Sequence, residues 1–166
     1  MMRYALLTLA LVVPLTAASA QAKKGGAPQT QRTVIVALPD QIAWGPAPAV
    51  LPVAAKLAVL EGDPTKSAAF TMRLFMPDGY QIPPHFHPAT EHVTVISGAL
   101  MVGMGEKFDE SQMKTLPAGA FGLIPARMHH YAKAKGETVL QLHGIGPWRL
   151  IYVNKADDPR KKVAAR

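Results

Sequence analysis

Three side chains that can bind a metal ion occur within seven residues: His85, His87 and Glu91. Residues two apart on a β-strand project from the same face, so the two histidines are expected to point together. On a straight strand Glu91 would lie about 13 Å beyond His87, at roughly 3.3 Å per residue, which is too far to share one ion. A bend across residues 88–90 is therefore predicted, because it would return the Glu91 carboxylate to the histidines.

A further ligand is expected from a second strand. The segment LPAGAFGLIPARMHHYA carries two adjacent histidines, His129 and His130. Adjacent residues of a strand face opposite ways, so at most one of the two can reach the site, and geometry alone leaves both choices open. A mixed set of imidazole and carboxylate ligands suits one divalent transition metal ion, with Fe, Mn, Ni, Cu and Zn all compatible.

The elements that must position these side chains are predicted to be strands. The apolar runs after residue 33 are short and are separated by turn signals, among them Pro77-Asp78-Gly79, Ser97-Gly98 and Lys135-Gly136. The clearest strand runs from Phe70 to Met76, where apolar residues alternate at period two. Helical periodicity over ten or more residues is missing after the first 20 residues. The pattern predicts an all-β sandwich or barrel that closes its own edges.

The N-terminus has the layout of a cleavable signal peptide. Arg3 precedes an uncharged, largely apolar stretch from Tyr4 to Ala20, which ends in small residues. A membrane anchor needs about 20 apolar residues, and Pro14 shortens the usable run below that. We expect a periplasmic or secreted protein with no stable membrane anchor after cleavage. The expected segments are residues 1–20 as signal peptide, 21–32 as flexible leader, 33–154 as a single β-barrel domain and 155–166 as a basic C-terminal tail.

Composition excludes some classes of function. The formal net charge is +7, and several of the positive charges lie near the ends of the chain rather than in a patch. Nucleic-acid binding would require a basic face with interleaved aromatic residues, which the sequence lacks, so no nucleic-acid partner is expected. The chain has no cysteine, so its stability must come from an ordinary core rather than from disulfides.

The segment GYQIPPHFHPATEHVTVISG resembles the first motif of the cupin superfamily. Gly79, His85, His87, Glu91 and Gly98 all stand at the spacing of that motif. The match covers both glycines as well as the three candidate ligands, so it is more specific than a pair of histidines alone.

A second segment is similar to the second cupin motif. Gly119 and Pro125 are kept, and His130 stands where the family has its last metal ligand. Two positions depart from the pattern, because Arg127 replaces the usual glycine and Ala134 replaces asparagine. Both are turn or supporting positions, so the departures concern the local loop geometry and remove no ligand.

The resemblance implies a small double-sheet barrel of the cupin, or jelly-roll, type. It implies one metal ion bound by His85, His87, Glu91 and His130 with open coordination positions, and it leaves His129 as the alternative fourth ligand. The expected function is a metal-dependent enzyme of dioxygenase-like or isomerase-like type that acts on a small molecule, with Glu91 also accepting a proton. The alternatives are a non-catalytic ligand-binding or sensing cupin and a structural, metal-stabilised barrel. A homodimer is a further expectation.

Two further histidines and a tryptophan are expected to lie outside the predicted set of metal ligands. His92 follows Glu91 and should point outward into solvent. His143 shares a strand face with Gln141, and either face of that strand could line the barrel, so a role near the substrate stays open for it. Trp148, beside a Gly-Pro pair, is interpreted as a packing residue at an end of the barrel.

Overall fold

The computed structural model describes residues 34–163. The predicted signal peptide and leader lie outside the described residues, so both stay predictions. The elements are, in chain order, η1 (Pro39–Gln41), β1 (Gly45–Pro46), β2 (Lys56–Gly62), β3 (Ala69–Met76), β4 (Gln81–Phe86), β5 (Glu91–Met104), η2 (Glu110–Gln112), β6 (Lys114–Pro117), β7 (Phe121–Ile124), β8 (His130–Ile145), β9 (Ile151–Tyr152), η3 (Lys155–Asp157) and α1 (Pro159–Val163).

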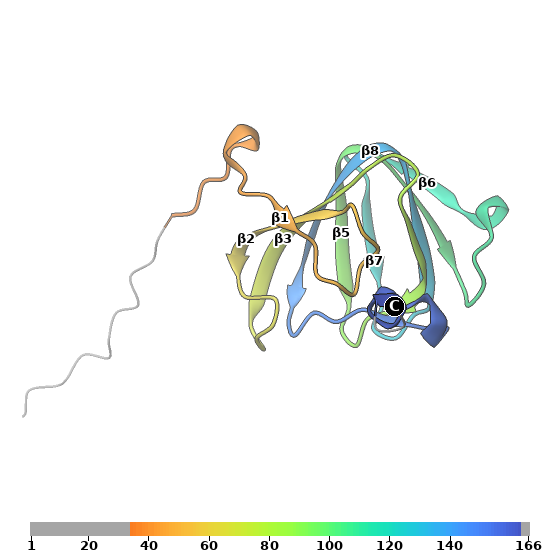
Figure 1. The fold of residues 1–166 in the computed structure, drawn as a ribbon. Coiled ribbons are helices and arrows are strands. Elements are labelled where there is room, and N and C mark those ends of the chain that lie inside the picture. Colours follow the sequence, from red (N-terminus) through yellow and green to blue (C-terminus); the bar gives the residue numbers. More distant parts are fainter. Residues whose placement is uncertain (1–33, 164–166) are drawn as a thin grey trace, which may run out of the picture. The chain divides into compact units, whose positions relative to one another are not determined.

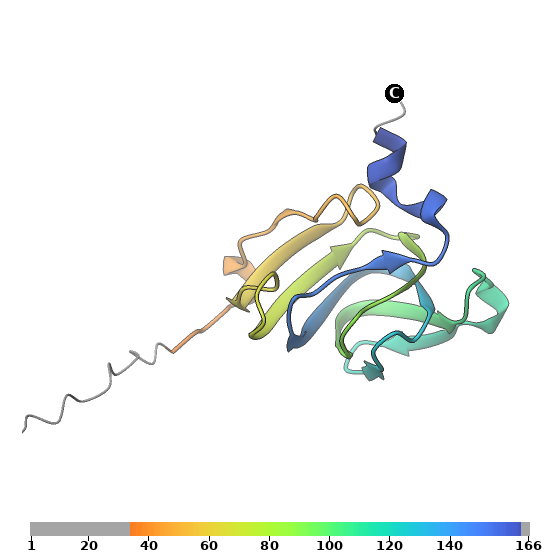
Figure 2. The same cartoon turned by 90° about the horizontal axis from the view of Figure 1, so that it is seen from below.

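The strands form one curled antiparallel sheet, which confirms the predicted all-β fold. Its main order is β1-β2-β3-β8-β4-β9, and β5 pairs with β6, β7 and β8. Strand β8 meets β3 and β4 at different parts of its length and also pairs with β5. Figures 1 and 2 show β5 and β8 curving so that the strands surround a common interior. The arrangement is that of a jelly-roll barrel.

The interior is filled by the apolar faces of the strands. In β3 the alternation is complete, with Phe70, Met72, Leu74 and Met76 buried and their neighbours more exposed, as the period-two pattern predicted. Residues from β4, β5, β8 and the segment before β2 complete this core, among them Ile82, Val93, Val95, Leu100, Leu140, Leu142 and Leu51. Two tyrosines anchor the segment around residue 51, since the Tyr80 and Tyr152 hydroxyls donate to the carbonyls of Pro52 and Val50 at 2.6 and 2.8 Å.

Two sites that were predicted to be turns instead lie inside long strands. Ser97-Gly98 falls within β5, and Lys135-Gly136 falls within β8. The register between these strands shifts on both sides of Ser97, and Gly98 and Gly136 have φ angles of 72° and 73°. A glycine with positive φ can bend a strand through a bulge without ending it. This is why β5 and β8 can each follow the curve of the barrel.

The predicted basic tail begins with folded structure. Within residues 155–163 the chain forms η3 and the five-residue helix α1. The Asn154 side chain accepts a hydrogen bond from the backbone N–H of Ala156, and the Asp158 side chain accepts one from that of Arg160, so both short elements have a polar residue at their start. Within the described residues, no helix has the length and apolar character needed to cross a membrane.

Candidate metal centre

The four predicted ligands lie where strands begin or end. His85 is in β4, His87 follows the last residue of that strand, and Glu91 and His130 are the first residues of β5 and β8. The chain bends across residues 88–90, as the separation of His87 from Glu91 requires. All four side chains are buried, with exposed fractions of 2, 4, 8 and 2% in that order.

Their burial is unusual for polar side chains. Five polar or charged residues in the described part of the chain are buried, and four of them are these predicted ligands. Leaving such a group without a partner costs about 1–3 kcal/mol. A set of four therefore needs an explanation in terms of contacts or function, because hydrophobic packing would be better served by apolar residues.

The ligand atoms converge. One ring nitrogen from each of His85, His87 and His130 lies within 4.8 Å of the other two. The Glu91 Oε2 atom is 3.5 Å from His87 Nε2 and 3.6 Å from His130 Nε2. Two nitrogens bound at about 2.1 Å to one tetrahedral ion lie roughly 3.4 Å apart, so the widest separation has to close by up to about 1.4 Å to surround an ion. The three histidines can therefore hold a metal ion, with the carboxylate beside them.

The second nitrogen of each ring is held by the backbone. Nδ1 of His85 lies 2.7 Å from the carbonyl of Pro83, that of His87 2.7 Å from the carbonyl of Arg149, and that of His130 3.0 Å from the carbonyl of Met128. A carbonyl oxygen only accepts, so Nδ1 must carry the proton and donate it. In a neutral imidazole Nε2 is then an acceptor, with its lone pair free for a metal ion.

With Nδ1 protonated in each ring, the Nε2 atoms of His87 and His130 are hydrogen-bond acceptors that face another acceptor, the Glu91 carboxylate. Nε2 of His87 is buried without a hydrogen-bond partner, and it faces the Glu91 carboxylate, which also only accepts when ionised. Two such groups at 3.5 Å repel each other unless a cation or a proton lies between them. The donor set therefore fits a divalent metal ion on its own chemistry.

The electrostatics favour the neutral form of the His85 and His87 imidazoles. Burial, together with the neighbouring His130 and His87, lowers the pKa of His85 to about 3 against the pull of Glu91. Burial also lowers the pKa of His87. For Glu91, burial acts to raise the pKa, but the positive charge that His87 and His130 carry when protonated and the hydrogen bond with His130 lower it more, so the pKa stays below its ordinary value. The site therefore presents unprotonated His85 and His87 and an ionised Glu91 carboxylate at neutral pH.

The other sequence candidates lie outside this cluster. His129 is 34% exposed, and its Nδ1 is 3.0 Å from Glu106 Oε1 on the surface. It is therefore His130, and not His129, that the fold brings to the three other predicted ligands. His92 and His143 are half-buried, while their neighbours Glu91 and Leu142 are the buried residues of the alternating pattern, so both of these histidines lie on the outer side of the sheet.

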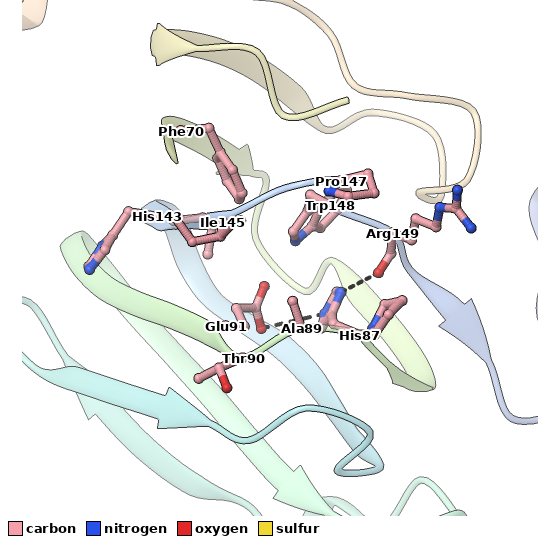
Figure 3. Close-up of a pocket in the computed structure, with 12 residues that line it drawn as sticks. Phe70, His87, Ala89, Thr90, Glu91, His143, Ile145, Pro147, Trp148 and Arg149 are labelled. Carbon is pink, nitrogen blue, oxygen red and sulfur yellow. Dashed lines mark hydrogen bonds and ion pairs between the residues drawn. The ribbon is translucent and has the colours of Figure 1, made fainter. Parts of the chain in front are cut away.

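Two contributors were missed from the sequence. The Trp148 ring stacks on His87 with a centroid distance of 5.3 Å and an interplanar angle of 28°, so it does more than the packing role predicted for it. The carbonyl of Arg149 is the acceptor that orients the same histidine, as Figure 3 shows. Both residues lie in the segment between β8 and β9, and no spacing rule connects that segment with the His87 motif.

Arg127 shows how the second motif tolerates the loss of its glycine. Its φ angle is 65°, in the left-handed region that glycine adopts at little cost. Its backbone N–H donates to the carbonyl of His87 at 2.8 Å, which connects the loop before β8 to the loop after β4. The turn conformation is thus kept, but a non-glycine residue at positive φ is strained, which costs conformational free energy.

The space next to the ligands is small and apolar. A cavity of about 40 Å³ is bordered by the four predicted ligands, Trp148 and core side chains such as Leu74, Val93, Ile124 and Leu150. A second, smaller cavity of about 10 Å³ is bordered by His87 and Glu91 together with Phe70, His143, Ile145, Pro147 and Arg149, which Figure 3 shows. One water molecule needs at least about 10–15 Å³ of such space, so the larger cavity holds a few waters at most.

Comparison with known proteins assigns the chain to a family. Residues 35–152 match the model of a domain of unknown function, DUF4437, which covers most of the chain and all four predicted ligands. The chain belongs to the DUF4437 family. No curated protein matches the sequence. Membership of this family therefore does not indicate an activity for the protein.

Solved structures show which fold this chain shares. The DUF4437 chain is similar to the polyketide cyclase RemF from Streptomyces resistomycificus, with 13% identity, a TM-score of 0.59 and coverage of 80% of this chain and 94% of that one. It is similar to a proposed acetylacetone dioxygenase from Methylibium petroleiphilum PM1, with 17% identity, a TM-score of 0.59 and coverage of 79% and 88%. An RmlC-like cupin from Shewanella frigidimarina NCIMB 400 matches with 14% identity, a TM-score of 0.51 and coverage of 76% and 97%. At these identities the likeness shows the fold, which is that of the cupin superfamily.

Proposed function

We propose that this DUF4437 protein is a metal-dependent cupin enzyme that acts on a small molecule. His85, His87, Glu91 and His130 are the proposed ligands of one divalent transition metal ion. The observation that carries the proposal is the orientation of the three imidazoles, whose Nδ1 atoms are bound to backbone carbonyls while a nitrogen of each faces a common point. The Glu91 carboxylate beside that point supplies the negative charge that a divalent cation needs.

The proposed chemistry depends on what the ion and the residues each contribute. When bound, an ion such as Fe, Mn, Ni, Cu or Zn supplies Lewis acidity or redox capacity at coordination positions not taken by the four side chains. The chain's own part is to orient the imidazoles, to exclude water with an apolar lining and to hold negative charge at Glu91. Glu91 Oε2 is also the group that would accept a proton from a substrate bound next to it.

The size of the interior limits the substrate class. With about 40 Å³ beside the ligands, the cavity suits dioxygen or the reactive end of a small compound rather than a whole sugar or peptide. A dioxygenase-like or isomerase-like reaction on a small carbonyl compound fits this space. The proposed dioxygenase and the polyketide cyclase among the similar structures support a substrate search that starts with small diketones.

The same small cavity also favours a second candidate function. A metal ion enclosed by four protein ligands and apolar side chains could have a purely structural role, in which it stabilises the barrel. In that case chelation would unfold the protein, and no small molecule would reach the ion. A non-catalytic sensing role lies between the two, with binding of a small ligand but no product.

The first test is metal content. We would express the full sequence, purify the protein and measure bound metals by elemental mass spectrometry for wild type, His85→Ala and His130→Ala. His129→Ala is the matched control, since this neighbouring histidine lies on the surface. We expect about one equivalent of metal in the wild type and in the control and a large loss in the other two. Absence of metal in the wild type after reconstitution with each candidate ion would refute the proposal.

The second test separates the candidate functions. Metal-loaded protein is incubated with a panel of small diketones, keto acids and aromatic compounds, with and without oxygen, and products are followed by mass spectrometry. Turnover that disappears in His85→Ala supports an enzyme. Tight binding without product supports a sensor. The absence of both binding and turnover supports a structural metal.

A further inference from the structure

A second pair of histidines lies on the outer side of the sheet, away from the proposed metal centre. His92 of β5 and His143 of β8 are directly opposite each other in the antiparallel register. Their chain neighbours Glu91 and Leu142 are the inward-facing residues, so the two imidazoles project outward together. Figure 3 shows the His143 ring directed away from Glu91 and His87.

The two rings are close and parallel. Their centroids are 4.8 Å apart, with an interplanar angle of 14°. The Phe121 ring covers the other side of His92 at 6.2 Å and 27°, which limits the positions that the His92 ring can take. Nδ1 of His92 is buried and has no hydrogen-bond partner among the described residues. A buried polar atom without a partner calls for an explanation, and an ion bound to that ring is one of the few available.

The surroundings favour a cation. Both rings line an open groove of about 540 Å³ on the surface. Among the described residues that line this groove, Glu61 is the one charged side chain, and its Oε2 accepts a hydrogen bond from the Thr71 hydroxyl at 3.3 Å. The lining contains no lysine or arginine, so nothing in the groove would repel a positive ion.

We propose that His92 and His143 form a second metal site, which takes a divalent cation with a preference for imidazole such as Cu²⁺, Ni²⁺ or Zn²⁺. Each ring contributes one nitrogen. In the stacked arrangement the nitrogen lone pairs lie in the planes of the two rings and do not point at each other, so metal binding requires one ring to turn out of the stack. With that ring turned, a nitrogen of each residue can bind one ion at about 2.1 Å, because the two residues are directly opposite each other in the register. Water and the oxygens of the groove complete the coordination.

This site is independent of the proposed inner centre. It shares no ligand with His85, His87, Glu91 and His130, and its rings lie on the opposite face of β5 and β8. With two protein ligands in an open groove, its affinity is expected to be lower than that of a buried set of four. Its failure would therefore leave the proposed function untouched, and the reverse also holds.

The test uses Cu²⁺ as the probe, with binding followed by titration calorimetry and electron paramagnetic resonance. The wild type is expected to bind two equivalents, and the double variant His85→Ala/His130→Ala one. Adding His143→Phe to either background keeps a flat ring against His92 but removes both nitrogens. We expect it to weaken the outer site at least about tenfold, which is about 1.4 kcal/mol, and to remove the signal of a second coupled nitrogen.

Controls make either outcome informative. His129→Gln removes a surface histidine outside the pair and should leave copper binding unchanged. Circular dichroism checks that every variant is folded, and the wild-type background serves if the double variant is not. The proposal is overturned if the wild type binds copper only at the inner centre, or if His143→Phe and His92→Phe both bind the second equivalent as tightly as the wild type.

Discussion

In each histidine of the proposed centre, one hydrogen bond to a main-chain carbonyl fixes the orientation and the tautomer of the ring. Because the Pro83 carbonyl accepts the Nδ1 proton of His85, the Nε2 lone pair of that ring is available to an ion. The same holds for His87 and His130. The Glu91 carboxylate, close to two of the imidazoles, adds the charge that makes the set selective for a divalent cation.

This residue-scale argument predicts the effect of Glu91→Gln. The substitution keeps the size of the side chain and removes its negative charge, so metal affinity should fall at least about tenfold. Competition with a chromophoric chelator would measure the change. Glu106→Gln is the matched control, because this exposed carboxylate pairs with the surface residue His129 and lies outside the cluster of proposed ligands. Equal affinity in Glu91→Gln and in the wild type would exclude the carboxylate as a ligand.

The lowered pKa of the buried histidines predicts a pH dependence for the metal-free protein. Below pH 6.5 the unfolded chain protonates His85, whereas the folded protein does not until its pKa of about 3. The unfolded state then binds more protons, so the free energy of unfolding falls as the pH falls. For this one group, about 1.6 kcal/mol should be lost between pH 6.5 and pH 5.

Urea unfolding of metal-free protein at several pH values would measure this loss. His87, whose pKa is also lowered, adds to it with the same sign. His85→Gln should reduce the slope of stability against pH, and His129→Gln should leave the slope as in the wild type. A slope that is the same in all three proteins would show that His85 is protonated in the folded state.

At the scale of elements, the centre depends on strands that bend without ending. Gly98 lies where the register of β5 against β8 shifts, and it has a φ angle of 72°. A Cβ atom there would lie 2.2 Å from the carbonyl oxygen of Glu137 and 2.6 Å from the Thr138 hydroxyl. The bend thus requires glycine for both its conformation and its space. It also directs the two halves of β5 along different parts of the barrel.

Two motif glycines provide a matched pair for a stability prediction. Gly79 has nearly the same φ angle, 70°, but a Cβ atom there would meet nothing within 4 Å. Gly79→Ala should therefore cost only the strain of positive φ, about 1–2 kcal/mol. Gly98→Ala should cost that amount plus the backbone clash, about 1–3 kcal/mol more. Urea unfolding of both variants would test this, and equal losses would contradict the role assigned to the close approach.

The elements also show what sequence patterns can and cannot predict. The period-two pattern of β3 and the need for a bend between His87 and Glu91 follow from local geometry, so both could be predicted. The same local signals were wrong at Ser97-Gly98, because glycine at positive φ serves a bulge as well as a turn. The contact of Trp148 with His87 could not be predicted, since it depends on where a loop 61 residues further along the chain returns.

On the scale of the whole molecule, the described residues hold one apolar core that is built without the proposed ligands. Residues of β3, β4, β5 and β8 contribute to that core, together with Leu51 and Leu150 from connecting segments. The centre occupies the positions where β4 ends and where β5 and β8 begin, next to this core. A barrel built in this way is expected to stay folded without metal but to lose the part of its stability that binding supplies.

The last prediction follows from that arrangement. An ion present at 100 times its dissociation constant stabilises the folded state by about 2.7 kcal/mol, because it binds the folded chain and not the unfolded one. For a domain of this size, each kcal/mol shifts the melting temperature by about 4 °C, so chelation should lower it by about 10 °C. Circular dichroism should still report a cooperative β-protein at 25 °C. Complete unfolding on chelation would instead favour a structural metal, and an unchanged melting temperature in wild type and His85→Ala alike would indicate that the ligands hold no ion.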